Sequence, residues 1–214
     1  MTKAVIFDCD GVLVDSEPPA FALLAEDLAR HGLPLTPAEM ELHFLGGTIS
    51  GAADKARALG AALPRNWVAD FYERLYARLA EGIPLIPGVT DLLDHLDAAG
   101  IPYAVGSNGT LRKMQVTLGQ FPGLHQRFHG RLFSGQALGA PKPAPDLYLH
   151  AAAALNTLPA DCAVIEDSPT GARAAKAAGI PCFGYAAAGH AEALAAEGAT
   201  IFTDMAELPT LLGL

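Results

Sequence analysis

Two aspartates, Asp8 and Asp10, stand two positions apart where the apolar run 4–7 ends and Gly11 follows. Two carboxylates this close resist being ionised together, so the pKa of one should rise unless a cation or fixed donors intervene. The ionised member of such a pair can act as a nucleophile while the other carries a proton. The glycine lets the chain turn and offer backbone N–H groups to an anion. The alternative is a pair of solvated acids in an ordinary turn.

Two more polar motifs follow apolar segments. Ser107 and Asn108 come after the run 101–106 and precede a helical pattern, so the hydroxyl and the following N–H groups could hold a phosphate oxygen. A serine that only caps the helix is the alternative. Lys142 lies between two prolines, whose fixed φ angles favour an extended segment and restrict the ammonium group. Its alternative is an ordinary surface lysine.

A further acidic pair, Glu166 and Asp167, follows the apolar run 162–165. Together with Asp8 these carboxylates would crowd one poorly solvated place, and a hard divalent cation would relieve their repulsion. Oxygen ligands without His or Cys favour Mg²⁺ over Zn²⁺. The alternative is that Asp167 or Ser168 caps the helix that begins at Pro169, a use that is compatible with metal binding.

These motifs require a scaffold of strands alternating with helices. Continuous apolar runs predict strands at 4–7, 101–106, 132–134, 162–165, 181–185 and 200–202, with helices at 88–99, from 111, at 145–155 and at 168–178. Such runs are typical of strands buried on both faces. We therefore expect an α/β fold, a Rossmann-like open parallel sheet with helices on both faces. All four motifs fall at the carboxyl ends of strands or in the loops that follow them, where such sheets bind ligands.

The stretch 17–82 contains no convincing strand. Helical patterns cover 18–31, 36–44, 49–59 and 65–80, and the second begins with a capping box from Thr36 to Glu39. We expect a core of residues 1–16 and 83–214, with residues 17–82 as an inserted all-helical cap. Between cap helices, the best candidates to approach a substrate are Gly46, Gly47 and Thr48, although a helix-breaking turn explains the glycines equally well.

Composition restricts the class of partner. The chain of 214 residues is 51% hydrophobic and carries a net charge of −9, which argues against nucleic acid or an anionic membrane as the main partner. Its three cysteines, Cys9, Cys162 and Cys182, form no metal-like cluster and predict buried, reduced thiols. The beginning of the chain has no pattern typical of a secretory or membrane segment. We expect a cytoplasmic monomer.

Taken together, the four motifs resemble those of the haloacid dehalogenase-like superfamily, and specifically its subgroup of phosphatases and sugar phosphomutases with a small helical cap. They occur in the family's order along the chain. The resemblance covers the predicted core and, more loosely, the helical insertion. The matching segments are 8–17, Gly106-Ser107-Asn108, Pro141-Lys142-Pro143 with Asp146, and Ile165-Glu166-Asp167-Ser168.

The resemblance implies a mechanism. Asp8 would be an ionised nucleophile that forms an aspartyl phosphate, and Asp10 would protonate the leaving alcohol and then activate water. The implied cofactor is Mg²⁺, held by Asp8, the carbonyl of Asp10 and Asp167. Glu166 would either contact the metal or lie behind the ligands that do.

The same resemblance assigns the phosphoryl group to Ser107 and Lys142, joined by N–H groups near Gly11 and Asn108. Phosphoryl transfer chiefly needs positioning and charge neutralisation, which these residue types supply. The implied activity is a Mg²⁺-dependent phosphatase. Its partner would be a small phosphorylated metabolite, either a sugar phosphate or a phosphorylated acid.

A sugar phosphomutase similar to the β-phosphoglucomutases is the main alternative, because it shares all four motifs. Those enzymes have a histidine ten residues after the second aspartate and an arginine near the start of a cap helix. Here Ala20 stands at the first place, and the segment 44–49 contains no arginine. This departure favours a phosphatase. The remaining candidates for an anion contact from the cap are Arg57, Arg65, Arg74 and Arg78.

Three other functions fit less well. A dehalogenase needs no proton for its leaving halide, so Asp10 would have no use. A phosphonate-cleaving enzyme of the superfamily needs a cap lysine, and the spacing of Lys55 does not match well. A non-catalytic phosphate-binding protein would leave both Asp10 and the acidic metal set without a role.

Overall fold

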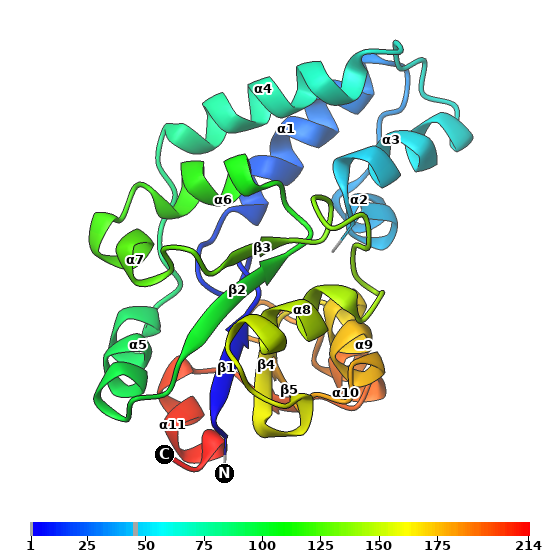
Figure 1. Ribbon diagram of the computed structural model, residues 1–214. Helices are drawn as coiled ribbons and strands as arrows, with labels where there is room; N and C mark the ends of the chain where they lie inside the picture. Colours follow the sequence, from blue (N-terminus) through cyan, green and yellow to red (C-terminus); the bar gives the residue numbers. More distant parts are fainter. Residues whose placement is uncertain (1, 45–46) are drawn as a thin grey trace.

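The protein is built around one parallel sheet, as Figure 1 shows. The computed structural model describes residues 2–44 and 47–214, so the expected substrate residue Gly46 lies outside the described residues. The six strands follow the order β3-β2-β1-β4-β5-β6, and every neighbouring pair is parallel. They are β1 (Ala4–Phe7), β2 (Tyr103–Ser107), β3 (Leu132–Ser134), β4 (Cys162–Glu166), β5 (Cys182–Tyr185) and β6 (Thr200–Phe202).

Both faces of the sheet are covered. Successive side chains of β1 alternate between two cores, with Val5 and Phe7 in one and Ala4 and Ile6 in the other. The first core includes side chains of α5 (Val89–Ala98), α6 (Leu111–Leu118), α7 (Pro122–Arg127) and α11 (Leu208–Leu212), and it continues into the helices between residues 17 and 82. The second includes side chains of α8 (Asp146–Ala154), α9 (Pro169–Ala177) and α10 (Ala191–Ala196). The predicted α/β, Rossmann-like architecture is confirmed.

Between β1 and α5 the chain forms four helices, which we call the four-helix segment. They lie together above the carboxyl ends of the strands in Figure 1. Trp67 stacks on Phe71 with 4.8 Å between ring centroids. The indole N–H of Trp67 also donates to the buried carboxylate of Asp27 (2.5 Å), which pairs with Arg74 (3.0 Å). The helices are α1 (Glu17–Arg30), α2 (Pro37–Phe44), α3 (Ile49–Ala58) and α4 (Trp67–Ala80).

The sequence patterns predicted the first and last residues of most helices and strands to within two or three positions. The capping box forms, because the Thr36 N–H donates to Glu39 Oε2 (2.8 Å) and the Glu39 N–H to Thr36 Oγ1 (3.4 Å). The second strand begins at Tyr103 rather than at residue 101. Three short helices, α7, α10 and α11, were not predicted.

No helix among residues 2–44 and 47–214 is long and apolar enough to cross a membrane. All three cysteines are free and buried, as expected.

Candidate active site

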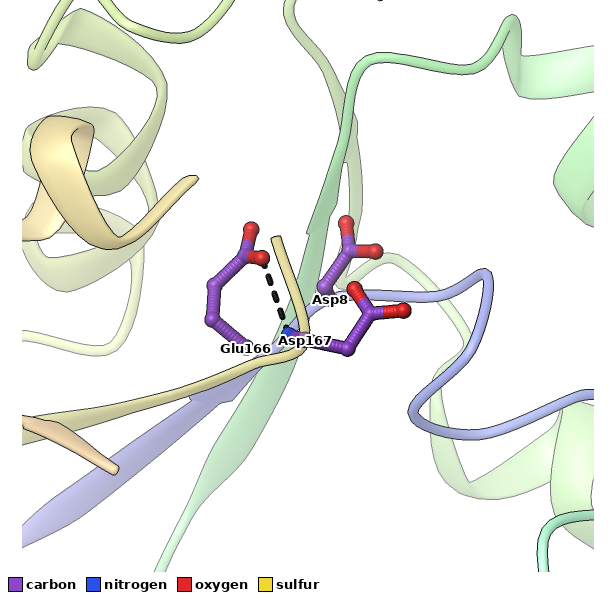
Figure 2. A group of neighbouring side chains, drawn as sticks. All are labelled: Asp8, Glu166 and Asp167. Atoms are coloured by element: carbon purple, nitrogen blue, oxygen red, sulfur yellow. Dashed lines mark hydrogen bonds between the residues drawn. The ribbon is translucent and has the colours of Figure 1, made fainter. Parts of the chain in front are cut away.

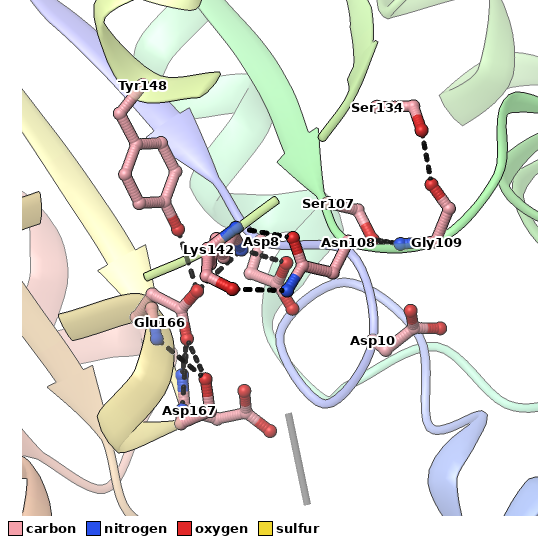
Figure 3. A network of polar contacts seen from close by, with 12 residues as sticks. Asp8, Asp10, Ser107, Asn108, Gly109, Ser134, Lys142, Tyr148, Glu166 and Asp167 are labelled. Carbon is pink, nitrogen blue, oxygen red and sulfur yellow. Dashed lines mark hydrogen bonds and ion pairs between the residues drawn. The ribbon is translucent and has the colours of Figure 1, made fainter. Parts of the chain in front are cut away.

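The predicted polar motifs meet at one edge of the sheet. Register pairs Phe7 of β1 with Val105 of β2 and with Ile165 of β4, so the residues that follow these positions converge. Figure 2 shows the carboxylates of Asp8, Glu166 and Asp167 beside one another at the ends of β1 and β4. Figure 3 adds Ser107, Asn108 and Lys142 to the same cluster. The fold therefore brings the four motifs to a single place.

Lys142 joins two of the acidic residues. Its Nζ donates to Asp8 Oδ1 (2.5 Å) and to Glu166 Oε1 (2.6 Å), and its side chain is only 3% exposed. The Asn108 side chain holds the Lys142 backbone, accepting its N–H (2.8 Å) and donating to its carbonyl (3.2 Å). The segment is not extended as expected, because the Ala144 N–H donates to the Pro141 carbonyl and closes a turn. Side-chain clamping by Asn108 thus positions the ammonium.

Glu166 is completely buried and is hydrogen-bonded through both oxygens. Besides Lys142, Oε1 accepts from the Tyr148 hydroxyl (2.7 Å). Oε2 accepts from the N–H of Asp167 (3.1 Å) and from the N–H and hydroxyl of Ser168. Gly171 lies against this carboxylate, since a Cβ there would come within 1.6 Å of Oε1. These contacts fix Glu166 behind Lys142 and at the start of α9.

Gly11 makes the expected turn, but its own N–H is not left for an anion. We expected its N–H to bind an anion, but this group donates to the Val14 carbonyl (2.8 Å) and is already paired. The residue has φ of +76°, and a Cβ would lie 1.9 Å from Asp167 Oδ2. Glycine is therefore required for the turn and for the close approach of the Asp167 carboxylate.

The acidic cluster carries more negative charge than its surroundings balance. Burial raises the pKa of Asp8 to about 7, with Glu166 and Asp10 adding to the effect and Lys142 opposing it. Burial and the nearby charges of Glu166 and Glu17 raise the pKa of Asp167 well above its usual range.

A metal ion fits this arrangement. Ligand oxygens of Asp8, Glu166 and Asp167 all lie within 4.8 Å of one another. Such oxygens, with uncompensated charge and little solvent, suit a hard divalent cation. Because both oxygens of Glu166 are hydrogen-bonded elsewhere, Asp8 and Asp167 are the better placed to contact it.

Asp10 has a cationic partner that the sequence analysis missed. Lys113 Nζ lies 2.8 Å from Asp10 Oδ1, and the Ser16 hydroxyl donates to the same oxygen. Burial alone would raise the pKa of Asp10, but Lys113 and Ser16 together lower it below its usual value. Before any metal binds, the order of the Asp8 and Asp10 pKa values is thus opposite to the expected one. A cation beside Asp8 would lower the pKa of Asp8.

A sequence signal for Lys113 existed. Thr110 caps α6 by accepting the Lys113 N–H (3.0 Å), so Lys113 stands in the first helical turn. A cation is unfavourable there because the helix dipole is positive at that end. A lysine at such a position, in a chain with few basic residues, indicates a carboxylate partner.

A cavity lies between the polar cluster and the four-helix segment. Counting the part open to solvent, it encloses about 870 Å³, a size suited to a small ligand. Gly47 and Thr48 line it, and the Thr48 hydroxyl also caps α3 by accepting the Gly51 N–H (3.0 Å). Ala20 lines it too. Thr48 therefore borders the cavity and also begins a helix, and its contact with a substrate stays a prediction.

The basic residues of the four-helix segment contact other groups. Arg74 pairs with Asp27, Arg78 with Glu81, and Arg57 with Asp54. Lys55 Nζ donates to the His43 carbonyl (2.7 Å). Of the described residues of this segment, no Arg or Lys lines the cavity.

Comparisons with known proteins agree with this geometry. A family model described as haloacid dehalogenase-like hydrolase matches residues 2–179. The 6-phosphogluconate phosphatase of Escherichia coli (strain K12) is 34% identical over 211 residues, covering 98% of this chain and 94% of that protein. Hexitol phosphatase A of the same strain is 32% identical over 181 residues, covering 83% and 80% respectively.

A solved structure is also similar. The crystal structure of a CbbY mutant from Rhodobacter sphaeroides in complex with xylulose-1,5-bisphosphate superposes with a TM-score of 0.83 at 29% identity, covering 97% of this chain and 96% of that one. The chain belongs to the haloacid dehalogenase-like hydrolase family. It falls in the phosphatase subgroup, and the expected enzyme class, phosphoric monoester hydrolase, is confirmed.

Proposed function

We propose that the protein is a Mg²⁺-dependent phosphatase that hydrolyses a small phosphorylated metabolite through an aspartyl phosphate on Asp8. The carrying observation is the position of Asp8, which contacts Lys142 and lies in one cluster with Asp167, while Asp10 faces the same cavity. A nucleophile, a fixed cation, a metal site and a second carboxylate are the parts that phosphoryl transfer through a covalent intermediate needs.

In the first step an oxygen of ionised Asp8 attacks phosphorus and the bond from phosphorus to the leaving oxygen breaks. Asp10 takes up a proton from solvent when the phosphoryl anion binds beside it, because nearby negative charge raises the pKa that Lys113 and Ser16 otherwise lower. It then gives this proton to the leaving oxygen, so an alcohol leaves.

Lys142 Nζ and the Ser107 hydroxyl donate to phosphoryl oxygens. Ser107 Oγ already accepts the Gly109 N–H (2.9 Å), which orients its own proton away from that group. Asp10 acting as acid and then base would contribute about 10² to 10⁴ in rate.

In the second step Asp10 takes a proton from water while the water oxygen attacks phosphorus. The bond from phosphorus to Asp8 breaks, and its electron pair returns to the carboxylate. Lys113 fixes the position of Asp10 in both steps (2.8 Å). By stabilising ionised Asp10 it favours the form that takes the proton from water in the second step and opposes the protonated form that the first step needs.

Mg²⁺, when bound by Asp8, Asp167 and the Asp10 carbonyl, supplies charge neutralisation for the phosphoryl group. Glu166 acts from behind by orienting Lys142 and the turn before α9. The anion-binding site is completed by the loop that carries Ser107 and Asn108.

We further propose that residues 17–82 act as a cap over a core of residues 1–16 and 83–214. The support is that α1, α3 and α4 contribute side chains to the cavity wall opposite the acidic cluster. Closure of such a segment excludes water and completes the substrate site.

A mutase must grip a second phosphate, and the four-helix segment brings no described cation to the cavity. This observation favours water as the final phosphoryl acceptor. It also agrees with Ala20 at the position where the similar mutases have histidine.

The test is phosphate release from a panel of phosphorylated metabolites with Mg²⁺, with EDTA, and with the variant Asp8→Asn. We expect activity that depends on Mg²⁺ and falls by about 10⁴-fold or more in the variant. The variant should retain the far-UV spectrum of the wild type, because the substitution keeps the side-chain shape. Full activity in a folded Asp8→Asn variant would overturn the proposal.

A further inference from the structure

The positive charge of the cavity is confined to one end. Among the described residues, the lysines and arginines that line it are Lys113 and Lys142, and both come from the core. Each already has a carboxylate partner, Asp10 for Lys113 and Asp8 with Glu166 for Lys142. These cations are placed for the transferring phosphoryl group. The undescribed residues 45 and 46 are leucine and glycine, so they add no charge.

The opposite wall is largely apolar. Side chains from three helices of the four-helix segment and from the end of α2 form it, including Phe21, Leu24, Phe44, Ile49 and Leu75. Ala20, which stands where the resemblance to the mutases would place a histidine, belongs to this wall. An anionic group placed against this wall would lose its hydration without gaining a cation.

One charged residue does lie on the wall formed by the four-helix segment, and its charge is negative. Glu17, at the start of α1, lines the cavity and is half-buried. Among the residues that the structure describes, its carboxylate has no hydrogen-bond or ion-pair partner. A carboxylate of this kind accepts hydrogen bonds from hydroxyl groups and repels a second anion.

From this distribution we propose that the leaving group is an uncharged alcohol with apolar surface and at least one further hydroxyl, and that a second phosphate or a carboxylate on the substrate is rejected. The inference rests on the proposed phosphatase function and narrows its substrate class. The similar proteins divide on this point, since a hexitol phosphate ends in a neutral hydroxyl whereas 6-phosphogluconate and xylulose-1,5-bisphosphate carry a second anion.

Two matched pairs of compounds test the inference. Sorbitol 6-phosphate and 6-phosphogluconate differ only in a terminal hydroxymethyl or carboxylate group. Fructose 1-phosphate and fructose 1,6-bisphosphate differ in the second phosphate. With Mg²⁺ at pH 8, we expect kcat/KM for the neutral member to exceed that for the anionic member by about 10²-fold in each pair.

The variant Glu17→Gln tests the source of the selectivity. It removes the charge with little change of shape, so the preference for the neutral member should fall by about tenfold. A factor of this size corresponds to the repulsion between two charges a few ångström apart at an intermediate dielectric constant. An assay at pH 8 keeps Glu17 ionised, because burial raises its pKa to about 7. The matched control is Glu26→Gln, an equal charge change at an exposed position of the same helix, which should leave the ratio unchanged.

The outcomes separate the two proposals. An equal or faster reaction of the anionic member in either pair would overturn the inference while leaving the phosphatase function intact. The same holds if none of the four compounds reacts but p-nitrophenyl phosphate is still hydrolysed. Loss of p-nitrophenyl phosphate hydrolysis as well would contradict the proposed function itself, and the inference with it.

Discussion

The two sides of the cavity differ in how their side chains are held. On the core side every charged group except Asp167 has a charged partner at hydrogen-bond distance, as with Lys142 and Asp8 or Lys113 and Asp10. On the side of the four-helix segment the wall is mostly apolar, and its one carboxylate, Glu17, has no partner among the described residues. This difference supports the proposal that the core side holds the phosphoryl group and a metal, whereas the other side accommodates the rest of the substrate.

This difference separates chemistry from selection. In the proposed mechanism, the groups that act on phosphorus must keep one geometry, and they stand at or near the ends of buried strands, where the sheet fixes them. The groups proposed to distinguish substrates stand on helices that follow β1. Substitutions on the core side should therefore change kcat for every substrate, whereas those on the helical side should change relative rates or stability.

The largest effect is expected for Lys142→Met. It removes the cation that contacts both Asp8 and Glu166, so phosphoryl charge is no longer balanced in a buried place. We expect kcat/KM to fall by about 10³-fold for neutral and anionic substrates alike. Steady-state kinetics on both matched pairs checks this. A change confined to one member of a pair would contradict the division between the two sides.

The affinity for the metal should increase as the pH rises. Burial raises the pKa of Asp8 to about 7 in the folded, metal-free protein, above its value of about 3.9 when unfolded. Because the folded protein holds this proton more tightly than the unfolded chain does, protonation of Asp8 stabilises the folded protein at low pH. This stabilisation is lost as the pH rises through about 7, so the metal-free protein becomes less stable. Mg²⁺ bound to the ionised form, as proposed, would restore that stability.

The thermal shift caused by Mg²⁺ should therefore be larger at pH 8 than at pH 5.5. At a concentration about 100 times Kd the gain is about 2.7 kcal/mol, or roughly 5 to 10 °C in a chain of this size. Differential scanning calorimetry with and without Mg²⁺ measures it. The matched control, Asp167→Asn, should lose most of the shift, and an equal shift at both pH values would refute the linkage.

On the helical side, Asp27→Ala should act on stability. Asp27 accepts from the Trp67 indole and pairs with Arg74, so its removal leaves a buried donor unsatisfied. We expect a loss of about 2 kcal/mol in the free energy of unfolding, with kcat for the remaining folded enzyme nearly unchanged. Urea unfolding measures it, with Asp54→Ala on the exposed face of α3 as the control. A 10²-fold loss of kcat would show that the two sides are not separate.

The smallest effect is expected where the two sides touch. The Gln136 amide donates to the Tyr72 hydroxyl of α4 (2.9 Å) and to the Asn108 carbonyl (2.6 Å), joining the four-helix segment to the loop that carries Asn108. Tyr72→Phe should raise KM by about fivefold, the equivalent of one hydrogen bond of about 1 kcal/mol. The increase should be equal for both members of each matched pair. A changed ratio would instead make Tyr72 a selectivity residue, and Tyr185→Phe on β5 serves as the control.

The core side could be predicted far better than the helical side. Asp8 directly follows β1, and Ser107 and Glu166 are the last residues of β2 and β4, so a local apolar pattern predicted their place at one edge of the sheet. Lys113 was missed because its partner Asp10 is distant in sequence and only the fold brings α6 beside the first loop. Tyr148, which donates to Glu166, was missed for the same reason.

The cavity wall was missed for a different physical reason. Phe21 and Leu24 follow a helical period, and periodicity indicates that a face is apolar without saying whether it packs on protein or borders a cavity. Glu17 appears in the sequence as one more acid at a helix start, which is a common position for an acid. Its lack of a partner is a property of the folded chain alone.

The covalent intermediate on Asp8 can be tested most directly with the Asp10→Asn variant and p-nitrophenyl phosphate in the presence of Mg²⁺. The p-nitrophenolate group leaves without a proton, so the first step should proceed while water activation is impaired. We predict a burst of one p-nitrophenol per active site and, after acid quench and digestion, a peptide containing Asp8 that is heavier by one phosphoryl group. Release of p-nitrophenol with no phosphoryl group on Asp8 would contradict the account.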